Sequence, residues 1–523
     1  MSFTPESTLP PPASNQNGAA RLLSGVVEAD RFALRGTCWS QTPSGVRVAE
    51  RADTLAADIG QGRPTLDPQA LYDYLFFHAI PSPRTVFRGV NRLPAGHRLS
   101  ADARGQAQVE RHWLPRFAPS RRADFNVLRD EFRRLLQEAV ARRLDGSTPA
   151  CFLSGGTDSS TVAGMIRDAT GGPAEAYSIG FEADGYDEMA YARLAAKHFR
   201  AKHHEYYITP SDLVKSIPAV AASYDQPFGN SSALPAYYCA RMAKADGVSL
   251  MLAGDGGDEL FGGNQRYAQQ GVFERYQWLP VVLRQELLEP WLADVSKPRP
   301  WLLRKAASYV EQARQTMPGR LDFYNLLMRL GVDRVLTPGF MALVDRDGPR
   351  RDQQAVWNET GAADLLNNHL AFDWRYTLAE NDLPKVCGTA ALAGVDVAFP
   401  LLDDALVDFS QNLPIDYKLR GKYLRWFFKE ALRGYLPDEI ITKSKHGFGL
   451  PFGTWMVKDA GLKALASDSL DALVERGLAQ PDFVGRLLSE HVPSHPGFYG
   501  EMVWILMMLE QWLRAHAPQW KVR

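Results

Sequence analysis

The sequence predicts an α/β protein in which a parallel sheet, covered by helices on both faces, is followed by a mainly helical carboxyl-terminal part. Short apolar runs alternate with helical periodicity between about residues 150 and 255. This repetition of strand, loop and helix is typical of parallel strands joined by crossover helices. Two of the apolar runs end in glycine-rich loops that carry acids, and from about residue 270 onward the apolar spacing is helical.

Charge and cysteine content argue against several classes of function. The chain of 523 residues carries 59 Lys and Arg against 60 Asp and Glu, a balance that disfavours a nucleic-acid partner. There is no basic-then-apolar leader, and the apolar run from Met502 is too short to span a bilayer. We therefore expect a cytoplasmic protein with no membrane partner. The cysteines, which show neither metal nor redox spacing, are Cys38, Cys151, Cys239 and Cys387.

The segment ahead of the sheet is predicted in three pieces. Residues 1–30 are rich in Ser, Pro, Asn and Ala, which predicts a disordered lead. Residues 31–118 resemble a small mixed domain, with a helical stretch around Leu71 to Phe77. An amphipathic helix follows the next linker, and its interspersed acids make its arginines a solvated face. The apolar face of this helix consists of Leu128, Phe132, Leu135, Leu136 and Ala139.

The alternation that predicts the sheet can be followed along the chain. ACFL (150–153) is predicted as a buried strand and STVAGMIRDA (160–169) as the helix after it. AEAYSIGF (174–181) is a second strand, and EMAYARLAAKHF (188–199) a second helix. VSLMLAG (248–254) is a further buried strand that ends in a glycine-acid loop. The pattern predicts parallel strands whose carboxyl ends share one edge of the sheet.

The first glycine-rich loop, SGGTDSS (154–160), follows a predicted strand and opens a predicted helix. Backbone N–H groups at a helix N-terminus favour an anion, and Gly155 and Gly156 allow a tight turn close to a ligand. Asp158 would be repelled by bare phosphate, so we expect Mg²⁺ between them. The GK[ST] ending of a Walker A loop is absent, and a capped glycine turn is the plain alternative. Hydroxyl donors for phosphate come from Ser154, Ser159 and Ser160.

The second glycine-rich loop, GDGGDELFGG (254–263), has five glycines and three carboxylates in ten residues. It also ends a buried strand, and ligands of open α/β sheets collect at the carboxyl ends of strands. Asp158 from the first loop and Asp258 from the second could therefore share one metal ion. An acidic surface turn is the alternative for this loop.

These motifs together resemble a known family. SGGTDSS resembles the PP-loop of ATP pyrophosphatases, which have the adenine nucleotide α-hydrolase-like fold. Four further blocks resemble the synthetase domain of asparagine synthetases, β-lactam synthetases and lasso-peptide cyclases. The resemblance covers residues 120–515. The blocks are AGDGGDELFGG, YSIGFEADGYDEMAYARLAAKHFRAKHHE, GVDVAFPLLDDALVDF and KSKHGFGLPFGTW.

The resemblance implies an ATP-dependent ligase that forms carbon–nitrogen bonds, with ATP and Mg²⁺ as cofactors. A carboxylate of a small molecule or peptide attacks the α-phosphorus of ATP, giving an acyl-adenylate and pyrophosphate. Ammonia or an amine then displaces AMP. The residues implied for ATP are Leu153, Ser154, Gly155, Gly156, Asp158, Ser159, Ser160, Ile179, Ala253 and Gly254.

The resemblance also implies a metal site and two catalytic side chains. Asp158 and Asp258 would hold Mg²⁺. Lys445, in KSKHGF, would neutralise charge on the phosphate or the developing intermediate. Asp255 stands where asparagine synthetases carry Glu, and its carboxylate could orient the incoming amine or take its proton. A surface lysine and a turn residue are the plain alternatives for Lys445 and Asp255.

The front of the chain departs from the asparagine synthetases, whose glutaminase domain uses the cysteine after the initiator Met as nucleophile. Ser2 stands there instead. ALYDYLFFHAIPSPRTVFRGVNRLPAGHRL and the pair His112 and Trp113 resemble the second half of that domain. We infer a small α+β remnant of an Ntn glutaminase over residues 31–118 that hydrolyses no glutamine. Nitrogen would come from free ammonia, from an external ammonia-supplying protein or from an amine on the substrate.

Two departures in the catalytic part bear on the substrate. Asp396 and Ala398 stand where the family has Glu and Arg, and residues 387–389 fall where many relatives have an Asp-Arg pair. A missing arginine removes a bidentate carboxylate partner, so either that arginine is structural in relatives or the acyl substrate is not aspartate; we favour the second.

Other functions remain open. The chain could form a lactam or macrolactam from an amine within its substrate, or be a non-catalytic nucleotide-binding paralogue. RNA-modifying PP-loop enzymes are disfavoured by the balanced charge and scattered cysteines. The apolar helix EMVWILMMLEQWL (501–513) could join a homodimer, although burial in its own domain is the favoured interpretation.

Overall fold

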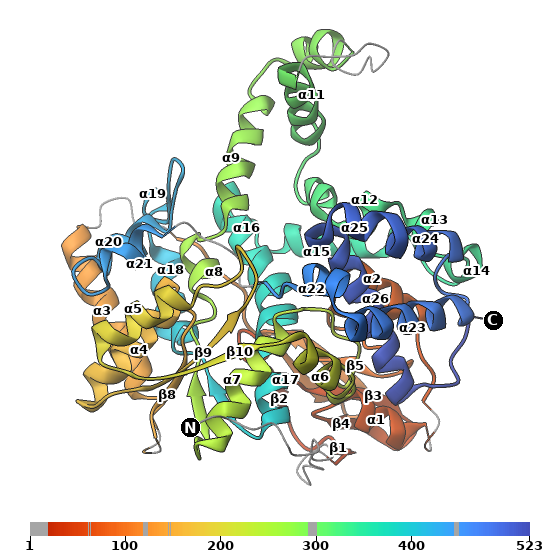
Figure 1. The fold of residues 1–523 in the computed structure, drawn as a ribbon, viewed down its shortest axis with the longest axis horizontal. Helices are drawn as coiled ribbons and strands as arrows, with labels where there is room; N and C mark the ends of the chain where they lie inside the picture. The colour runs from red at the N-terminus through yellow and green to blue at the C-terminus, as the bar shows by residue number, and fades with distance from the viewer. Residues whose placement is uncertain are drawn as a thin grey trace.

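The computed structural model describes residues 19–60, 62, 64–118, 124–144, 146, 148–290, 301–443 and 449–522. Within these residues the central sheet has five strands, all parallel, in the order β10-β9-β8-β11-β12 (Figure 1). The predicted parallel sheet is confirmed, and β10 and β12 are strands that the sequence pattern did not predict. The strands are β8 (Ala150–Phe152), β9 (Glu175–Phe181), β10 (Lys202–Ile208), β11 (Leu250–Leu252) and β12 (Asp396–Ala398).

Helices cover both faces of this sheet, as predicted. One face packs against α3 (Phe125–Ala141), α4 (Thr157–Thr170) and α5 (Met189–Phe199). The other packs against α6 (Pro210–Ser223) and α7 (Ala233–Ala245). Neighbouring strand residues alternate between the two hydrophobic cores because side chains of a strand point to opposite faces. Cys151, Ala176 and Leu252 enter the first core, and Ala150, Tyr177 and Met251 enter the second.

Helix α3 is the amphipathic helix that the sequence predicts. Asp124 caps it by accepting hydrogen bonds from the backbone N–H groups of Asn126 and Val127. Four of the five predicted apolar positions are buried, and Leu128 packs partly buried against the same core. The helix packs side by side with α4, whose first turn belongs to the first glycine-rich loop.

The N-terminal part forms two antiparallel sheets with the strand orders β1-β4-β3-β5 and β2-β6-β7. Strand pairing begins at Arg21, inside the predicted disordered lead, so the folded part starts earlier than the expected boundary at residue 30; residues 1–18 lie outside the described residues. The elements are β1 (Arg21–Leu22), β2 (Val27–Glu28), β3 (Cys38–Thr42), β4 (Gly45–Ala49), α1 (Ala52–Ile59), α2 (Pro68–Phe77), β5 (Asn91–Arg92), β6 (His97–Ala101) and β7 (Ala107–Arg111).

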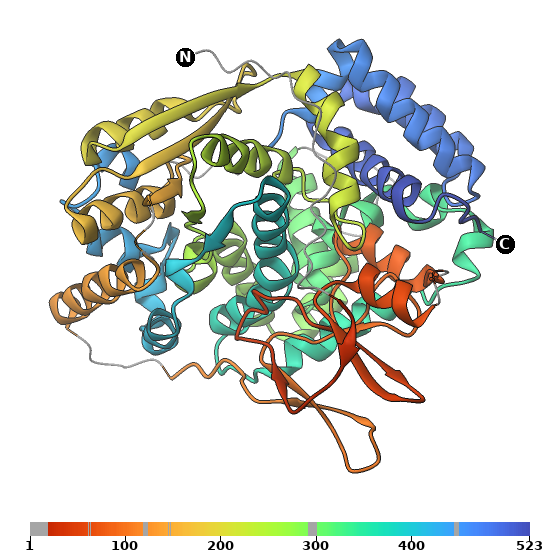
Figure 2. The ribbon, with the colours of Figure 1, turned by 90° about the horizontal axis from the view of Figure 1, so that it is seen from below.

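The N-terminal part is packed onto the rest of the chain (Figure 2). One hydrophobic core contains residues of α1 and α2 together with residues of the central sheet and of the last helix. The Tyr74 hydroxyl donates to the Ile505 carbonyl at 2.8 Å, and the Arg92 guanidinium pairs with Asp225 at 2.6 Å. The two parts therefore share one core, and a change in either is expected to affect the other.

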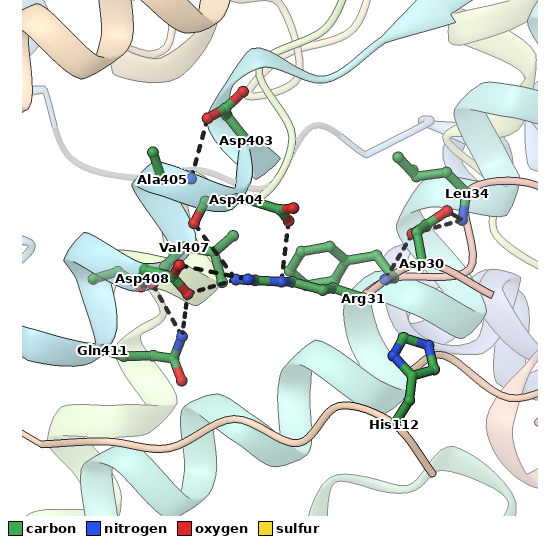
Figure 3. Close-up of polar contacts among 12 residues, drawn as sticks. Asp30, Arg31, Leu34, His112, Asp403, Asp404, Ala405, Val407, Asp408 and Gln411 are labelled. Carbon is green, nitrogen blue, oxygen red and sulfur yellow. Dashed lines mark hydrogen bonds and ion pairs between the residues drawn. The ribbon is translucent and has the colours of Figure 1, made fainter. Parts of the chain in front are cut away.

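Polar contacts hold the segment before β3 against α18 (Asp404–Asn412) (Figure 3). Arg31 Nε lies 3.0 Å from an Asp404 oxygen, and its Nη1 donates to Asp408 at 2.6 Å. The same guanidinium lies over the Trp113 ring, 5.1 Å from its centroid. His112, of the predicted glutaminase remnant, has Nε2 3.0 Å from the Ala29 carbonyl oxygen. His112 and Trp113 thus serve this packing.

The carboxyl-terminal part is helical, as predicted, and α9 and α11 rise from the body as an arm (Figure 1). The helices and short strands after β11 are α8 (Gly257–Phe261), α9 (Gln265–Gln277), η2 (Leu283–Leu288), α11 (Trp301–Ala313), η3 (Gly319–Tyr324), α12 (Leu326–Leu330), α13 (Val332–Val335), α14 (Pro338–Met341), α15 (Gly348–Glu359), α16 (Leu365–Asp373), η4 (Trp374–Asp382), α17 (Leu383–Ala393), η5 (Pro400–Leu402), α18 (Asp404–Asn412), α19 (Ile415–Lys418), β13 (Leu419–Arg420), β14 (Tyr423–Leu424), α20 (Trp426–Ala431), α21 (Asp438–Thr442), α22 (Phe452–Lys458), α23 (Ala460–Glu475), α24 (Pro481–Arg486), η6 (Leu487–His491), α25 (Val492–Ser494) and α26 (Pro496–His516).

Helix α26 contains the apolar run that raised the question of a subunit interface. Its residues from Met502 to Leu513 are buried within the chain, and Trp504 and Trp512 are fully buried. Burial in its own domain, the favoured interpretation, is confirmed. None of the described helices combines the length and the apolar character that crossing a bilayer requires.

Candidate nucleotide-binding active site

The two glycine-rich loops meet at the point where the order of the sheet reverses. From β8 the chain proceeds outward to β9 and β10, whereas β12 lies on the other side, next to β11. Strands β8 and β11 are neighbours in register, with Cys151 opposite Leu252. Their carboxyl ends therefore open into one crevice, which is where ligands of doubly wound sheets bind.

The first loop turns at Gly155, as predicted. Gly155 has φ +71°, and a Cβ there would collide with the backbone of Tyr191 and Ala192 in α5. Gly156 has φ −80° and precedes the first turn of α4, a conformation that other residues adopt without strain. Ser154 Oγ and Ser159 Oγ lie 3.0 Å apart, so the two hydroxyls face one another across the loop.

A cavity of about 970 Å³ opens over both loops. Ligand pockets range from roughly 300 to 1,000 Å³, so its size suits a nucleotide beside a second substrate. The predicted nucleotide residues that line it are Leu153, Ser154, Gly156, Asp158, Ser159, Ile179 and Gly254. Gly155, Ser160 and Ala253 are buried behind this wall, and the Ser160 hydroxyl has no hydrogen-bond partner among the described residues.

The structure brings the two predicted metal-binding acids together around an arginine. Arg425 Nη1 donates to an Asp158 oxygen at 2.7 Å and to an Asp258 oxygen at 2.9 Å. Its Nη2 pairs with the other Asp158 oxygen, and Nη1 also donates to the Thr157 hydroxyl at 3.2 Å. Burial by itself would lower the pKa of this guanidinium, but the two carboxylates raise it overall, so Arg425 stays charged.

Sequence reasoning missed Arg425 because no local pattern marks it. It lies in the stretch GKYLRWFF, more than 160 residues after Asp258. Its φ of +53°, directly before α20, aims the side chain at the sheet edge, and the guanidinium lies over the Phe428 ring at 4.0 Å. The packing of α20 against α3 and a hydrogen bond from the Arg425 N–H to the Gly262 carbonyl at 3.2 Å hold this residue beside the second loop.

Asp255 stands opposite a second cation that the sequence did not reveal. Lys385 Nζ lies 3.6 Å from an Asp255 oxygen and 3.1 Å from an Asp382 oxygen, and all three residues line the cavity. Burial raises the pKa of Asp255, and Lys385 opposes this shift only in part. The carboxyl therefore holds a proton more readily than an ordinary aspartate.

Lys445 lies outside the described residues. Lys443, two positions earlier, is described: its Nζ pairs with Glu188 at 2.8 Å and lies over the Tyr191 ring. Lys443 and Glu188 both line the cavity, so the segment that leads to Lys445 borders the site.

The residues that depart from the family pattern, which are Asp396, Ala398 and residues 387–389, are not among those that line the described cavity, although their neighbour Val386 is. A Cβ at Gly388 would meet the Tyr224 ring at 2.5 Å, so Tyr224 fills the space that a side chain would need. Burial raises the pKa of the Cys387 thiol to about 12. Asp396 and Ala398 belong to the edge strand β12, paired with β11.

The acids around Arg425 fit a magnesium ion. Mg²⁺ is commonly bound by one or two carboxylates together with substrate phosphates. Asp158 and Asp258 present two carboxylates to one cation, which in this structure is the Arg425 guanidinium. The described residues contain no group of three or more His, Cys, Asp or Glu side chains that could hold a metal without such phosphates.

Comparison with known proteins decides the family. The model of the family described as asparagine synthase matches residues 131–514, which include the central sheet, both loops and all but the last two residues of α26. The chain belongs to the asparagine synthase family. The match starts in α3, after the two antiparallel sheets, so the part that the family model covers includes the central sheet and the two loops beside the cavity.

Relatives in this family carry two kinds of name. A Mycobacterium tuberculosis protein provisionally named a glutamine-hydrolysing asparagine synthetase is 26% identical over 457 residues, covering 86% of this chain and 67% of its own length. Glutamine-hydrolysing asparagine synthetase 1 of Bacillus subtilis is 21% identical over 488 residues, covering 92% and 74%. Amidase chyE of Penicillium rubens is 25% identical over 417 residues, covering 71% and 60%.

Proposed function

We propose that this chain is an ATP-dependent amide-forming ligase that activates a carboxylate as its adenylate and transfers the acyl group to ammonia or a substrate amine. The observation that carries the proposal is the meeting of two acid-bearing loops around one cation at the switch point of the sheet. Membership of the asparagine synthase family supports a ligase that uses ATP.

The first step needs phosphate binding and charge neutralisation. The backbone N–H groups at the start of α4, with the hydroxyls of Ser154 and Ser159, would bind the β- and γ-phosphates. Asp158 and Asp258 would hold Mg²⁺, which when bound neutralises charge on the triphosphate and the departing pyrophosphate. The carboxylate oxygen forms a bond to the α-phosphorus while the bond to the β-phosphate oxygen breaks.

The second step needs a proton acceptor beside the acyl carbon. An amine attacks the adenylate carbonyl, the carbon–oxygen bond to AMP breaks, and one proton must leave the new amide nitrogen. Asp255 lines the same cavity as the phosphate loops and would take this proton. Lys385, held between Asp255 and Asp382, orients that carboxylate and stabilises it once it is charged.

The nitrogen is proposed to come from outside the N-terminal part. The thiol of Cys38, in that part, is fully buried, and burial raises its pKa to about 11, which disfavours the nucleophilic thiolate. His112 and Trp113 pack against the segment before β3. We infer that this part supports the catalytic part and hydrolyses no glutamine.

Pyrophosphate release from ATP and Mg²⁺ tests the proposal. It would be measured against a panel of carboxylates with ammonium, glutamine or no nitrogen source. Asp158→Ala and Asp258→Ala are compared with Asp416→Ala, an exposed aspartate away from the cavity. Release that requires one carboxylate, proceeds with ammonium but not glutamine, and disappears only in the first two variants supports the ligase. Release without added nitrogen points to an amine within the substrate, and no release with ATP bound contradicts the proposal.

A further inference from the structure

The cation between Asp158 and Asp258 belongs to the chain itself. Arg425 is 4% exposed, and its Nη1 donates to both carboxylates at 2.7 and 2.9 Å. Two glycines make room for this arrangement. A Cβ at Gly257 would collide with an Asp158 oxygen, and one at Gly263 would collide with an Asp258 oxygen and lie 2.5 Å from Arg425 Cδ. The loop is thus built to bring both acids to a single positive group.

Arg425 and a divalent ion cannot use these oxygens together. An ion bound to both carboxylates would stand within a few ångströms of the buried guanidinium, in a partly buried site where like charges repel more strongly than in water. Removing the guanidinium alone would leave two partly buried carboxylates side by side without their cation, which is also unfavourable. Exchange of one cation for the other avoids both costs.

One N–H donor of the guanidinium is not used in these contacts. Arg425 Nε is buried and has no hydrogen-bond partner among the described residues, although a buried donor without an acceptor is costly. The cavity beside it is the one that the phosphate loop faces. Phosphate oxygens, like carboxylate oxygens, match the geometry of a guanidinium group and bind it strongly. The backbone of Arg425 is held in the left-handed region at φ +53°, a conformation that side chains rarely adopt.

We propose that Arg425 is an exchangeable internal cation: it holds the acids of the metal site in the nucleotide-free chain and moves onto the triphosphate when Mg²⁺ and ATP enter together. The proposal has two halves. The first, that Arg425 closes the site to free Mg²⁺, concerns the chain without nucleotide. Only the second, that the guanidinium moves onto the triphosphate, rests on the proposed nucleotide site.

The first half, that Arg425 closes the site to free Mg²⁺, is tested by isothermal titration calorimetry of the full chain with Mg²⁺ in the absence of nucleotide. We expect no binding by the wild type at millimolar Mg²⁺. Arg425→Gln is expected to bind Mg²⁺ with an affinity at least tenfold higher than any binding by the wild type. This binding should disappear again in the Arg425→Gln, Asp158→Asn double variant. Arg425→Lys keeps the positive charge, so its metal site should stay closed to free Mg²⁺. Arg420→Gln, an exposed arginine of the same segment, is the matched control.

The second half is tested by the affinity for a non-hydrolysable ATP analogue with Mg²⁺. Arg425→Gln should bind the analogue at least tenfold more weakly than the wild type, because the phosphate contact is lost. Opposite changes for free Mg²⁺ and for the nucleotide support the exchange, whereas a merely structural arginine would weaken both. Wild type that binds free Mg²⁺ as tightly as a folded Arg425→Gln overturns the proposal.

A crystal structure of the wild type with Mg²⁺ and the analogue needs no variant. We expect Arg425 on a phosphate oxygen and the metal on Asp158 and Asp258. A metal bound with Arg425 still paired to both acids overturns the exchange. If no nucleotide binds while Arg425→Gln gains its Mg²⁺ site, the proposed function fails and the closing role of Arg425 stands.

Discussion

Asp158 and Asp258 bond to the same nitrogen atom, Nη1 of Arg425, although each follows a different strand of the sheet. Their loops are neighbours because β8 and β11 pair side by side, and the chain leaves these two strands in opposite directions. Two carboxylates at such a point form a place for a cation, and the chemistry proposed above depends on which cation occupies it.

The turn at Gly155 supports the phosphate loop, so Gly155→Ala is expected to damage both stability and nucleotide binding. The positive φ costs a side chain about 1–3 kcal/mol, and the new Cβ would also collide with α5. Gly156→Ala is the matched control for stability, because its φ is ordinary and its nearest contact is Ser154 Oγ at 3.4 Å. Urea unfolding of both variants and ATP-analogue binding by Gly155→Ala would check this, and equal losses of stability in the two variants would refute the argument.

Asp255→Asn is expected to separate the two half-reactions. The variant should keep carboxylate-dependent exchange of pyrophosphate into ATP, because Asp158 and Asp258 are intact. It should lose amide formation by about 10²–10⁴-fold, the range that a general base contributes. Exchange and product formation are measured on the same preparations. If both fall together, Asp255 acts in adenylation or in folding, and its role as proton acceptor is wrong.

Acid is expected to destabilise the fold through His78. Burial lowers the pKa of this imidazole from 6.5 to about 4, so the folded chain resists the proton that the unfolded chain takes up. The contribution of His78 to the free energy of unfolding is therefore complete above pH 6.5. It falls by about 3 kcal/mol as the pH drops toward 4. His78 ends α2 at φ +63°, a position that Asn tolerates. His78→Asn should show a shallower loss between pH 6.5 and 4 in urea unfolding; an unchanged slope would count against His78.

The ion pairs of Arg92 and Arg31, which join the N-terminal part to the rest of the chain, should differ in how much they stabilise the fold. Asp225→Asn leaves the Arg92 guanidinium charged and largely buried, which typically costs 3–5 kcal/mol. Arg31→Ala removes pairs whose acids, Asp404 and Asp408, are more than half exposed, and it should cost about 1 kcal/mol or less. Thermal unfolding of both variants checks the order, and the reverse order would contradict the shared-core interpretation.

Much of the fold follows from local pattern. The helical periodicity of α3, the alternation of β8, α4, β9 and α5, and the glycine-acid loops after β8 and β11 are properties of short stretches. Strands β10 and β12 escaped prediction for a physical reason. β10 carries the polar run KHHEYYI, and none of the three residues of β12 is buried, so neither has the buried apolar run that marks β8 and β11. The same holds for β1 and β2, two residues each, inside the predicted disordered lead.

The sequence by itself determined that Asp158 and Asp258 lie in loops that follow strands of one parallel sheet, because glycine, strand period and helix period are local signals. Only the tertiary structure decided that Arg425 closes the site between them and that Lys385 faces Asp255. Both pairs join residues more than 100 positions apart, and such contacts depend on how distant helices pack against the sheet. Local propensity cannot predict them, because it reports only on neighbours along the chain and not on which charges the tertiary packing brings together.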